Sequence, residues 1–400
     1  MSRTKFTKQQ KWVVGSMSSG FMLENMDVMF VSFALSSMIA DLHLSGGQAG
    51  FISSVTNLGM LAGGVIFGIL ADRIGRIKTF NYTVLLFAFG TAAMALANDI
   101  YLIYLLRFIT GLGAGGEYGI AMALIAENFP KKQVGRIASV GAIGGQLGAM
   151  LAAVLAAIVL PGNHWHALFL FGLLPVVLTI FVRRHVAESP RFKQQQTKPK
   201  VSLKAMFNVG RTGYTTIALM IMAIVQIAGY FGMMNWLPTM MQQKLNLTVA
   251  GSSVWMIATI TGMSVGMFVF GSILDKVGPR MAFGSFLIGS AVMVYGLTLA
   301  NSMGTLLLAG ALVGFFSNGM FGGYGAVISN LYPPEIRATA NNVIINVGRA
   351  VGGFSPVVIG MLMETRSMTF IMVGLSAMYM ISLLVMFTVP GLKAYSTEAS

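Results

Sequence analysis

Gly68-Ile-Leu-Ala-Asp72-Arg-Ile-Gly75-Arg76 occurs again, with changes, as Gly271-Ser-Ile-Leu-Asp275-Lys-Val-Gly278-Pro-Arg280, 203 residues later. The same spacing aligns two further pairs of segments: Gly111-Leu-Gly-Ala-Gly-Gly116 with Gly314-Phe-Phe-Ser-Asn-Gly319, and Phe129-Pro130 with Tyr332-Pro333. Three matches at one spacing indicate that the 400-residue chain consists of two homologous halves.

The composition places these halves in a membrane. The chain is 56% hydrophobic and 10% charged, with a mean hydropathy of +0.76, which is more apolar surface than a soluble domain of this length can bury. Its long apolar runs show no alternation of period two, so they predict helices rather than a β-barrel. Twelve of them are long enough to span a membrane of ~30 Å: residues 12–40, 50–71, 79–97, 100–127, 136–160, 165–182, 210–240, 248–274, 281–299, 303–330, 338–361 and 368–390.

The predicted fold is therefore an all-α membrane protein with twelve transmembrane helices in two pseudo-symmetric six-helix bundles. We expect an N-terminal bundle over residues 1–182 and a C-terminal bundle over 210–400. Residues 183–209 are polar, basic and contain proline, so we expect a cytoplasmic linker there.

The distribution of Lys and Arg predicts the orientation. If the N-terminus is cytoplasmic, 22 of the 26 basic residues lie on the inner side, and the outer loops hold only Lys244 and Arg366. This asymmetry predicts cytoplasmic termini and a cell membrane location, and the short loops suggest a bacterial inner membrane. The net charge of +14 is then explained by basic loops that face anionic lipid, rather than by binding of nucleic acid.

Several classes of function lack support in the sequence. The chain has no Cys, no phosphate-binding loop and no cluster of nucleophile and base, so we expect neither an enzyme nor a metal site. The expected energy source is a proton gradient, without a cofactor.

The residues at 68–76, which follow the second of twelve helices, resemble a motif of the major facilitator superfamily. The segments 107–117, Glu188-Ser-Pro-Arg191 and 331–339 resemble motifs of its sugar-porter-like branch. The resemblance implies a transporter that works by alternating access, and we expect it to function as a monomer.

Two further segments narrow the resemblance. Tyr230-Phe-Gly-Met-Met-Asn-Trp-Leu-Pro238 looks like carriers of nicotinate and aromatic acids, and Glu24-Asn-Met-Asp27 stands where aromatic acid–proton symporters have Asp-x-x-Asp. Sugar carriers usually have a paired Gln in the seventh helix, whereas this chain has Gln226 alone. The segment 141–148 has the glycines of a fifth-helix antiporter motif but not its proline.

Charged residues inside predicted helices are candidates for transport chemistry, because each costs several kcal/mol in a membrane. Glu24 and Asp27 share a helix face, and two close carboxylates do not both ionise easily. We therefore assign proton coupling to them together with Arg107 and Glu117. The alternative is a purely structural ion pair of these acids with Arg107 or Arg349.

Arg349 lies near the middle of its predicted helix, and the repeat aligns it with Gln146. An arginine binds a carboxylate through two parallel hydrogen bonds, so Arg349 predicts a small organic anion as substrate. Aromatic and amide side chains suit a flat ring. The predicted substrate-binding residues are Arg349, Gln146, Tyr118, Tyr230, Asn235, Trp236 and Asn318.

The repeated loop motif is predicted to act as a gate. Its glycines allow a tight turn, and its charges can pair with neighbouring helix ends. The family resemblance implies a latch that stabilises the outward-open state. The predicted gating residues are Gly68, Asp72, Arg73, Gly75, Arg76, Glu127, Arg136, Asp275 and Arg280.

The sequence thus predicts proton-coupled uptake of an aromatic or heterocyclic monocarboxylate by a secondary active transporter. Three alternatives stay open at this point: a drug–proton antiporter, a symporter of sugars or other metabolites, and a non-transporting receptor built on a carrier fold.

Overall fold

The computed structural model describes residues 6–129, 131–161, 164–177, 180, 207, 210–245, 247–332 and 337–392. These residues form helices and turns and contain no strand. Nine helices in the described ranges are long and apolar enough to cross a membrane, which confirms the predicted all-α membrane fold. The chain divides into two compact units, Met1–Leu44 with Phe51–Lys198 and Ser45–Gly50 with Pro199–Ser400. The predicted linker, 183–209, lies outside the described residues except for Phe207.

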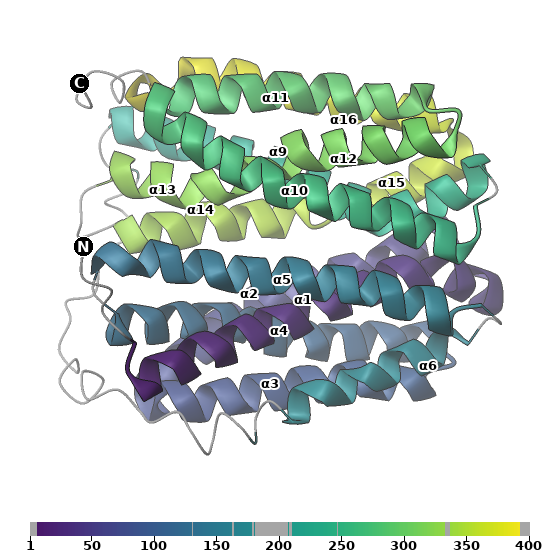
Figure 1. Ribbon diagram of the computed structural model, residues 1–400, viewed down its shortest axis with the longest axis horizontal. Helices are drawn as coiled ribbons and strands as arrows, with labels where there is room; N and C mark the ends of the chain where they lie inside the picture. The colour runs from purple at the N-terminus through teal and green to yellow at the C-terminus, as the bar shows by residue number, and fades with distance from the viewer. Residues whose placement is uncertain are drawn as a thin grey trace. The chain divides into compact units, whose positions relative to one another are not determined.

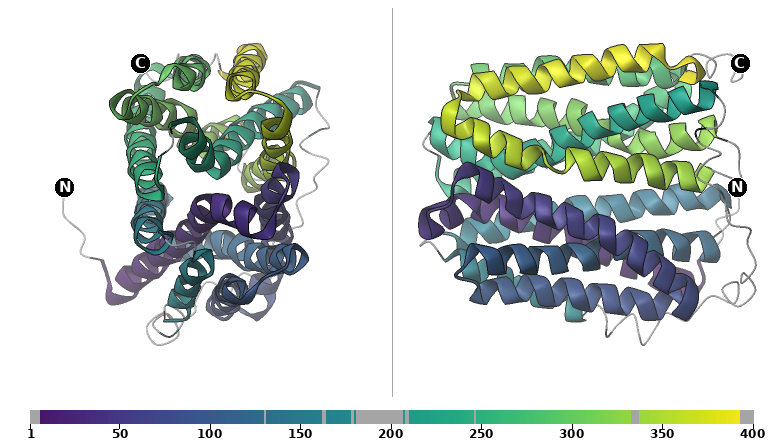
Figure 2. Two further views of the ribbon diagram at one scale, coloured as in Figure 1. Left: turned by 90° about the vertical axis from the view of Figure 1, so that its right-hand side faces the viewer. Right: turned by 180° about the vertical axis from the view of Figure 1, so that it is seen from behind.

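The first unit contains long helices that pack side by side (Figures 1 and 2). α1 packs along α5, and α3 packs along α4. The helices are α1 (Lys8–Leu42), α2 (Gly46–Ile74), α3 (Arg76–Ala93), α4 (Ile100–Asn128), α5 (Lys131–Val159) and α6 (Trp165–Phe169), which continues as a 3-10 turn, Leu170–Leu173. They occupy the first six predicted spans.

The second unit repeats one of these pairings: α14 packs along α9, as α5 packs along α1. In addition, α10 packs along α12 and α11 along α16. The helices are α9 (Gly210–Leu245), α10 (Val249–Val277), α11 (Pro279–Gly296), α12 (Met303–Gly319), α13 (Phe321–Leu331), α14 (Arg337–Gly352), α15 (Ser355–Thr365) and α16 (Met368–Thr388).

Two predicted helices are interrupted in the structure. The expected helix over 303–330 breaks at Met320 into α12 and α13, in a segment of four glycines whose freedom weakens a helix. The expected helix over 338–361 breaks after Gly352, because Pro356 lacks an N–H and its ring clashes with the carbonyl four residues earlier. The two segments still count as single spans, Met303–Ile328 and Val343–Thr365.

Glycine contacts repeat between the units at the spacing of the sequence repeat. A Cβ added to Gly63 of α2 would lie 2.0 Å from the carbonyl oxygen of Leu112 in α4. Gly266 and the oxygen of Phe315, each 203 residues later, make the same contact at 2.2 Å. The contact of Gly59 with Phe108 returns as Gly262 with Ala311, and that of Gly111 with Thr56 returns as Gly314 with Thr259. Small residues therefore bring the corresponding helices into backbone contact in both units.

The glycines of the 141–148 segment pack α5 against α1. A Cβ on Gly148 would lie 1.8 Å from the carbonyl oxygen of Met22, and one on Gly144 would lie 2.4 Å from that of Ser18. These glycines hold α1 in place, and α1 carries two of the predicted acids.

Candidate functional site

An ion pair joins α1 and α4 inside the first unit. Arg107 donates two parallel hydrogen bonds to Asp27, from Nη1 to Oδ1 at 2.9 Å and from Nη2 to Oδ2 at 2.8 Å. Both residues are buried, with exposed fractions of 1% for Arg107 and 2% for Asp27. This two-bond geometry is the strongest that an arginine makes with a carboxylate. Of the two arginines that the sequence left open, Arg107 is the one that pairs with Asp27.

Two threonines complete this ion pair. Thr91 of α3 donates from Oγ1 to Oδ1 of Asp27 at 2.8 Å. Arg107 donates from Nε to Oγ1 of Thr56 in α2 at 3.2 Å. The Thr56 hydroxyl in turn donates to the carbonyl oxygen of Ile52 at 2.9 Å. Four helices therefore hold the two charges, and the sequence reasoning missed both threonines because hydroxyl residues are common throughout the chain.

The described part of the second unit has no equivalent ion pair. The positions 203 residues after Asp27 and Arg107 are Tyr230 and Gly310. The indole of Trp255 occupies the space beside Gly310, where an added Cβ would lie 2.2 Å from Nε1. That nitrogen donates to the carbonyl oxygen of Leu306 at 2.8 Å. The repeat thus preserves the helix packing while one unit carries charge and the other an aromatic side chain.

Glu117 occupies a separate position on α4. It is buried, with 1% of its surface exposed, and its Oε1 has no hydrogen-bond partner among the described residues. A Cβ added to Gly20 of α1 would lie 1.9 Å from that oxygen. Glu24, half-buried on α1, interacts electrostatically with Glu117. The structure therefore brings these two acids together and pairs Asp27 elsewhere.

Arg349 lies in the last turn of α14 and is half-buried. Two glycines beside it bring α14 against α9: a Cβ on Gly348 would lie 2.7 Å from Cδ1 of Ile227, and one on Gly352 would lie 2.7 Å from the oxygen of Ile224. Gln146, its counterpart in the repeat, is half-buried on α5 of the first unit.

A small recess lies between α9, α10 and α12 in the second unit. Asn318 donates from Nδ2 to the sulfur of Met263 at 3.4 Å, and a thioether is a weak acceptor. Asn318 is 6% exposed, and a polar ligand atom would be a better acceptor for its amide N–H than this sulfur. The recess is lined by Tyr230, Met233, Met234, Met263, Val313, Gly314, Ser317 and Asn318.

The other predicted substrate residues lie elsewhere. Trp236 is 2% exposed and donates its indole N–H to the carbonyl oxygen of Pro356 at 2.8 Å, which joins α9 to α15. Asn235 is buried beside it on α9. The side chain of Tyr118 lies outside the described part of the chain.

The repeated loop motif forms the same turn in both units. Gly75 and Gly278 precede α3 and α11 with φ angles of 113° and 94°, which favour glycine. Arg280 donates to the carbonyl oxygen of Phe387 and stacks over its ring, 5.6 Å from the centroid. Arg73 and Asp275 are exposed, Arg76 is partly buried, and Gly68 has open space around it. The side chains of Asp72, Glu127 and Arg136 lie outside the described part, so their predicted pairing stays a prediction.

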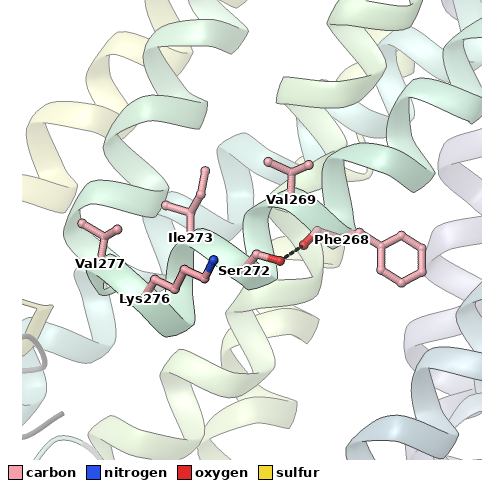
Figure 3. Close-up of a pocket in the computed structure, with 6 residues that line it drawn as sticks. All are labelled: Phe268, Val269, Ser272, Ile273, Lys276 and Val277. Carbon is pink, nitrogen blue, oxygen red and sulfur yellow. Dashed lines mark hydrogen bonds between the residues drawn. The ribbon is translucent and has the colours of Figure 1, made fainter. Parts of the chain in front are cut away.

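A second recess lies on the surface of α10 (Figure 3). Its lining comes from this one helix: Phe268, Val269, Ser272, Ile273, Lys276 and Val277. The hydroxyl of Ser272 donates to the carbonyl oxygen of Phe268 at 2.9 Å, so it is already used within the helix. A recess built from one helix face does not enclose a ligand, and we assign it no function.

The sequence profile of the family described as Major Facilitator Superfamily matches residues 17–266 and 240–399 of this chain. The chain belongs to the major facilitator superfamily. It is therefore a multi-pass membrane transporter, as the sequence resemblance implied. A putative metabolite transport protein of Haemophilus influenzae is 36% identical, over 97% of this chain and 98% of its own length.

Two further relatives are named for particular substrates. A putative niacin/nicotinamide transporter of Bacillus subtilis, NiaP, is 29% identical over 88% of each chain. A cis,cis-muconate transport protein of Acinetobacter baylyi is 27% identical over 90% of this chain and 89% of its own. Among solved structures, a D-xylose-proton symporter has a TM-score of 0.82 and 18% identity over 98% of this chain and 99% of that chain, which supports the fold.

Proposed function

We propose that this transporter takes up a small organic anion, an aromatic or heterocyclic monocarboxylate, together with protons. The observation that carries the proposal is the buried pair of Asp27 and Arg107. A proton that binds Asp27 removes the charge that Arg107 neutralises, and so weakens the contact between α1 and α4. Proton binding would thereby be linked to the packing of the first unit.

The proposed substrate class rests chiefly on Arg349 of the second unit. Arg349 is the proposed partner of the substrate carboxylate, and Gln146 is a proposed amide contact. Tyr230, Asn318 and the methionines of the recess are the proposed neighbours of an apolar ring in a conformation where the recess is wider, since a thioether adapts to the shape of an aromatic neighbour. The relative named for niacin/nicotinamide supports this class, because niacin is a heterocyclic monocarboxylic acid. The relative named for cis,cis-muconate supports only the wider class of small organic anions, because muconate is an acyclic dicarboxylate.

The remaining assignments are part of the same proposal. Both termini would be cytoplasmic in a cell membrane, with bundles at 1–182 and 210–400 joined by a linker at 183–209. One chain would supply the whole pathway. The residues of the repeated loop motif would form the gate between conformations.

The experiment is uptake into liposomes that contain the purified protein and a pH indicator. Nicotinate and benzoate are added first, then xylose, then a cationic drug. We expect protein-dependent internal acidification with a carboxylate, above the passive leak of the acid in protein-free vesicles. No response to any acid, with alkalinisation by a cationic drug in preloaded vesicles, would refute uptake and favour drug–proton antiport.

Two variants separate substrate binding from proton coupling. Arg349→Gln should abolish carboxylate uptake, because the amide cannot form the charged two-bond contact. Asp27→Asn should lower proton-driven accumulation while exchange of labelled for unlabelled substrate continues. Unchanged uptake by Arg349→Gln, or unchanged accumulation by Asp27→Asn, would remove that residue from its role.

A further inference from the structure

Asp27 and Glu117 are buried acids of the first unit that differ in the hydrogen bonds they accept. Asp27 accepts hydrogen bonds from Nη1 and Nη2 of Arg107 at 2.9 and 2.8 Å and from Thr91 at 2.8 Å. Oε1 of Glu117 accepts no hydrogen bond from the described residues, although the side chain is just as buried. The first environment stabilises a carboxylate, and the second suits a neutral carboxylic acid.

The space that holds the Glu117 carboxyl exists because α1 has a glycine there. A Cβ on Gly20 would lie 1.9 Å from Oε1 of Glu117 and 3.6 Å from the ring of Phe80. Two neighbouring helices present identifiable groups here: α3 presents the apolar ring of Phe80, and α1 presents Gly20 and the acid Glu24. On α4 itself, the cation of Arg107 is ten residues away, about 15 Å along the helix, and it is bound to Asp27.

We propose that Glu117 is a second proton-binding site of the transport cycle, which carries its proton in this conformation while Asp27 is the carboxylate. The proposal rests on the proposed function, since it assumes that transport is coupled to protons. Its basis is that one unit holds two buried acids in different surroundings. Because these acids share no partner, each can hold and release a proton separately.

Glu24 provides the route for this proton. It lies four residues after Gly20, on the same face of α1, and it is half-buried where Glu117 is fully buried. Water on one side gives a proton to Glu24, which passes it to Oε1 of Glu117. The O–H bond breaks in the next conformation and the proton returns to water on the other side. With Asp27, two protons accompany one monovalent anion, so each cycle moves one net positive charge.

The test measures the number of coupled protons in liposomes, with radiolabelled nicotinate as the probe. The membrane potential is held at zero with valinomycin and equal potassium on both sides. For a pH step of one unit, net flux stops at a nicotinate ratio of about 10-fold for one proton and about 100-fold for two. We expect about 100-fold for the wild type and about 10-fold for Glu117→Gln.

Asp99→Asn is the matched control. Asp99 is the N-cap of the same helix, where its side chain accepts from the amides of Tyr101 and Leu102 at 3.0 and 3.1 Å, and asparagine caps equally well. This variant should keep the ratio of the wild type. A wild-type ratio of about 10-fold, or an unchanged ratio in Glu117→Gln, would overturn the second proton site. The absence of any protein-dependent gradient in the wild type would instead refute proton symport itself.

Infrared spectroscopy tests the same proposal without transport. The C=O stretch of a protonated carboxyl should be present at neutral pH in the wild type, absent from Glu117→Gln and unchanged in Asp27→Asn. Gly20→Ala should shift or remove this band, because its Cβ takes the place of the carboxyl oxygen. If Glu117→Gln does not fold, the carboxyl bands of the wild type and of Gly20→Ala are compared instead. Identical bands in these two proteins would overturn the proposal.

Discussion

Replacement of Arg107 by methionine should expose the energetic role of the ion pair. Arg107→Met keeps an apolar chain on α4 but leaves Asp27, 2% exposed, with Thr91 as its remaining hydrogen-bond partner among the described residues. The variant loses the two charge-assisted hydrogen bonds to Asp27, worth about 1.5–3 kcal/mol each. A buried pair that loses one partner is destabilised by about 3–5 kcal/mol, and the two figures agree. We therefore expect Arg107→Met to lower the free energy of unfolding by about 4 kcal/mol.

The prediction also includes a recovery of stability when both charges are removed. Asp27→Asn combined with Arg107→Met removes both charges, and a neutral replacement of a buried pair is often close to harmless. The double variant should therefore be more stable than Arg107→Met alone by about 2 kcal/mol or more. Reversible unfolding of the purified protein by SDS in mixed micelles measures all four states of this cycle.

A surface arginine provides the control. Arg366 lies at the end of α15, exposed, with its guanidinium 5.3 Å from the ring of Phe370. Arg366→Met should change the free energy of unfolding by less than about 1 kcal/mol. If the effects of Asp27→Asn and Arg107→Met are simply additive, the two residues are not energetically coupled, and the reasoning from their two hydrogen bonds is wrong.

Three further changes test the packing and the recess. Gly75→Ala should cost about 1–2 kcal/mol, because its φ of 113° is strained for any residue with a Cβ. Gly148→Ala should cost about 1–3 kcal/mol, since the new methyl lies 1.8 Å from a carbonyl oxygen of α1. Gly68→Ala, which has open space, is the control for both in unfolding by SDS, and equal stabilities would contradict the argument. Asn318→Leu should weaken nicotinate binding about 10-fold through loss of one amide donor, whereas Asn81→Leu, a buried amide on α3, should leave it unchanged in equilibrium binding.

The fold could be predicted from the repeat and from hydropathy. The boundaries of most helices followed, because twenty apolar residues in lipid have few alternatives to a helix. The breaks at Met320 and after Gly352 were not predicted, since glycine and proline are tolerated inside membrane helices and Pro238 leaves α9 continuous. Hydropathy counts both broken helices as single spans, so it carries no signal for either break.

The candidate site was predicted in part. The sequence identified Asp27, Arg107 and Glu117 because a charge in a membrane helix stands out against apolar neighbours. It left open which arginine pairs with which acid, and it grouped Glu24 with Asp27 because they are three residues apart. In the structure Asp27 pairs with Arg107, whereas Glu24 interacts with Glu117.

The sequence by itself determined the class of protein, its helical apolar spans, the repeat and the list of charges inside the membrane. These depend on composition and on local spacing, which the amino-acid sequence contains directly. Tertiary structure alone decided the partners: the threonines that complete the ion pair, the glycine that makes room for Glu117, and the tryptophan that replaces the pair in the second unit. Each joins residues 51 or more positions apart. Such contacts depend on how helices pack, and helical periodicity fixes only which side chains share a face.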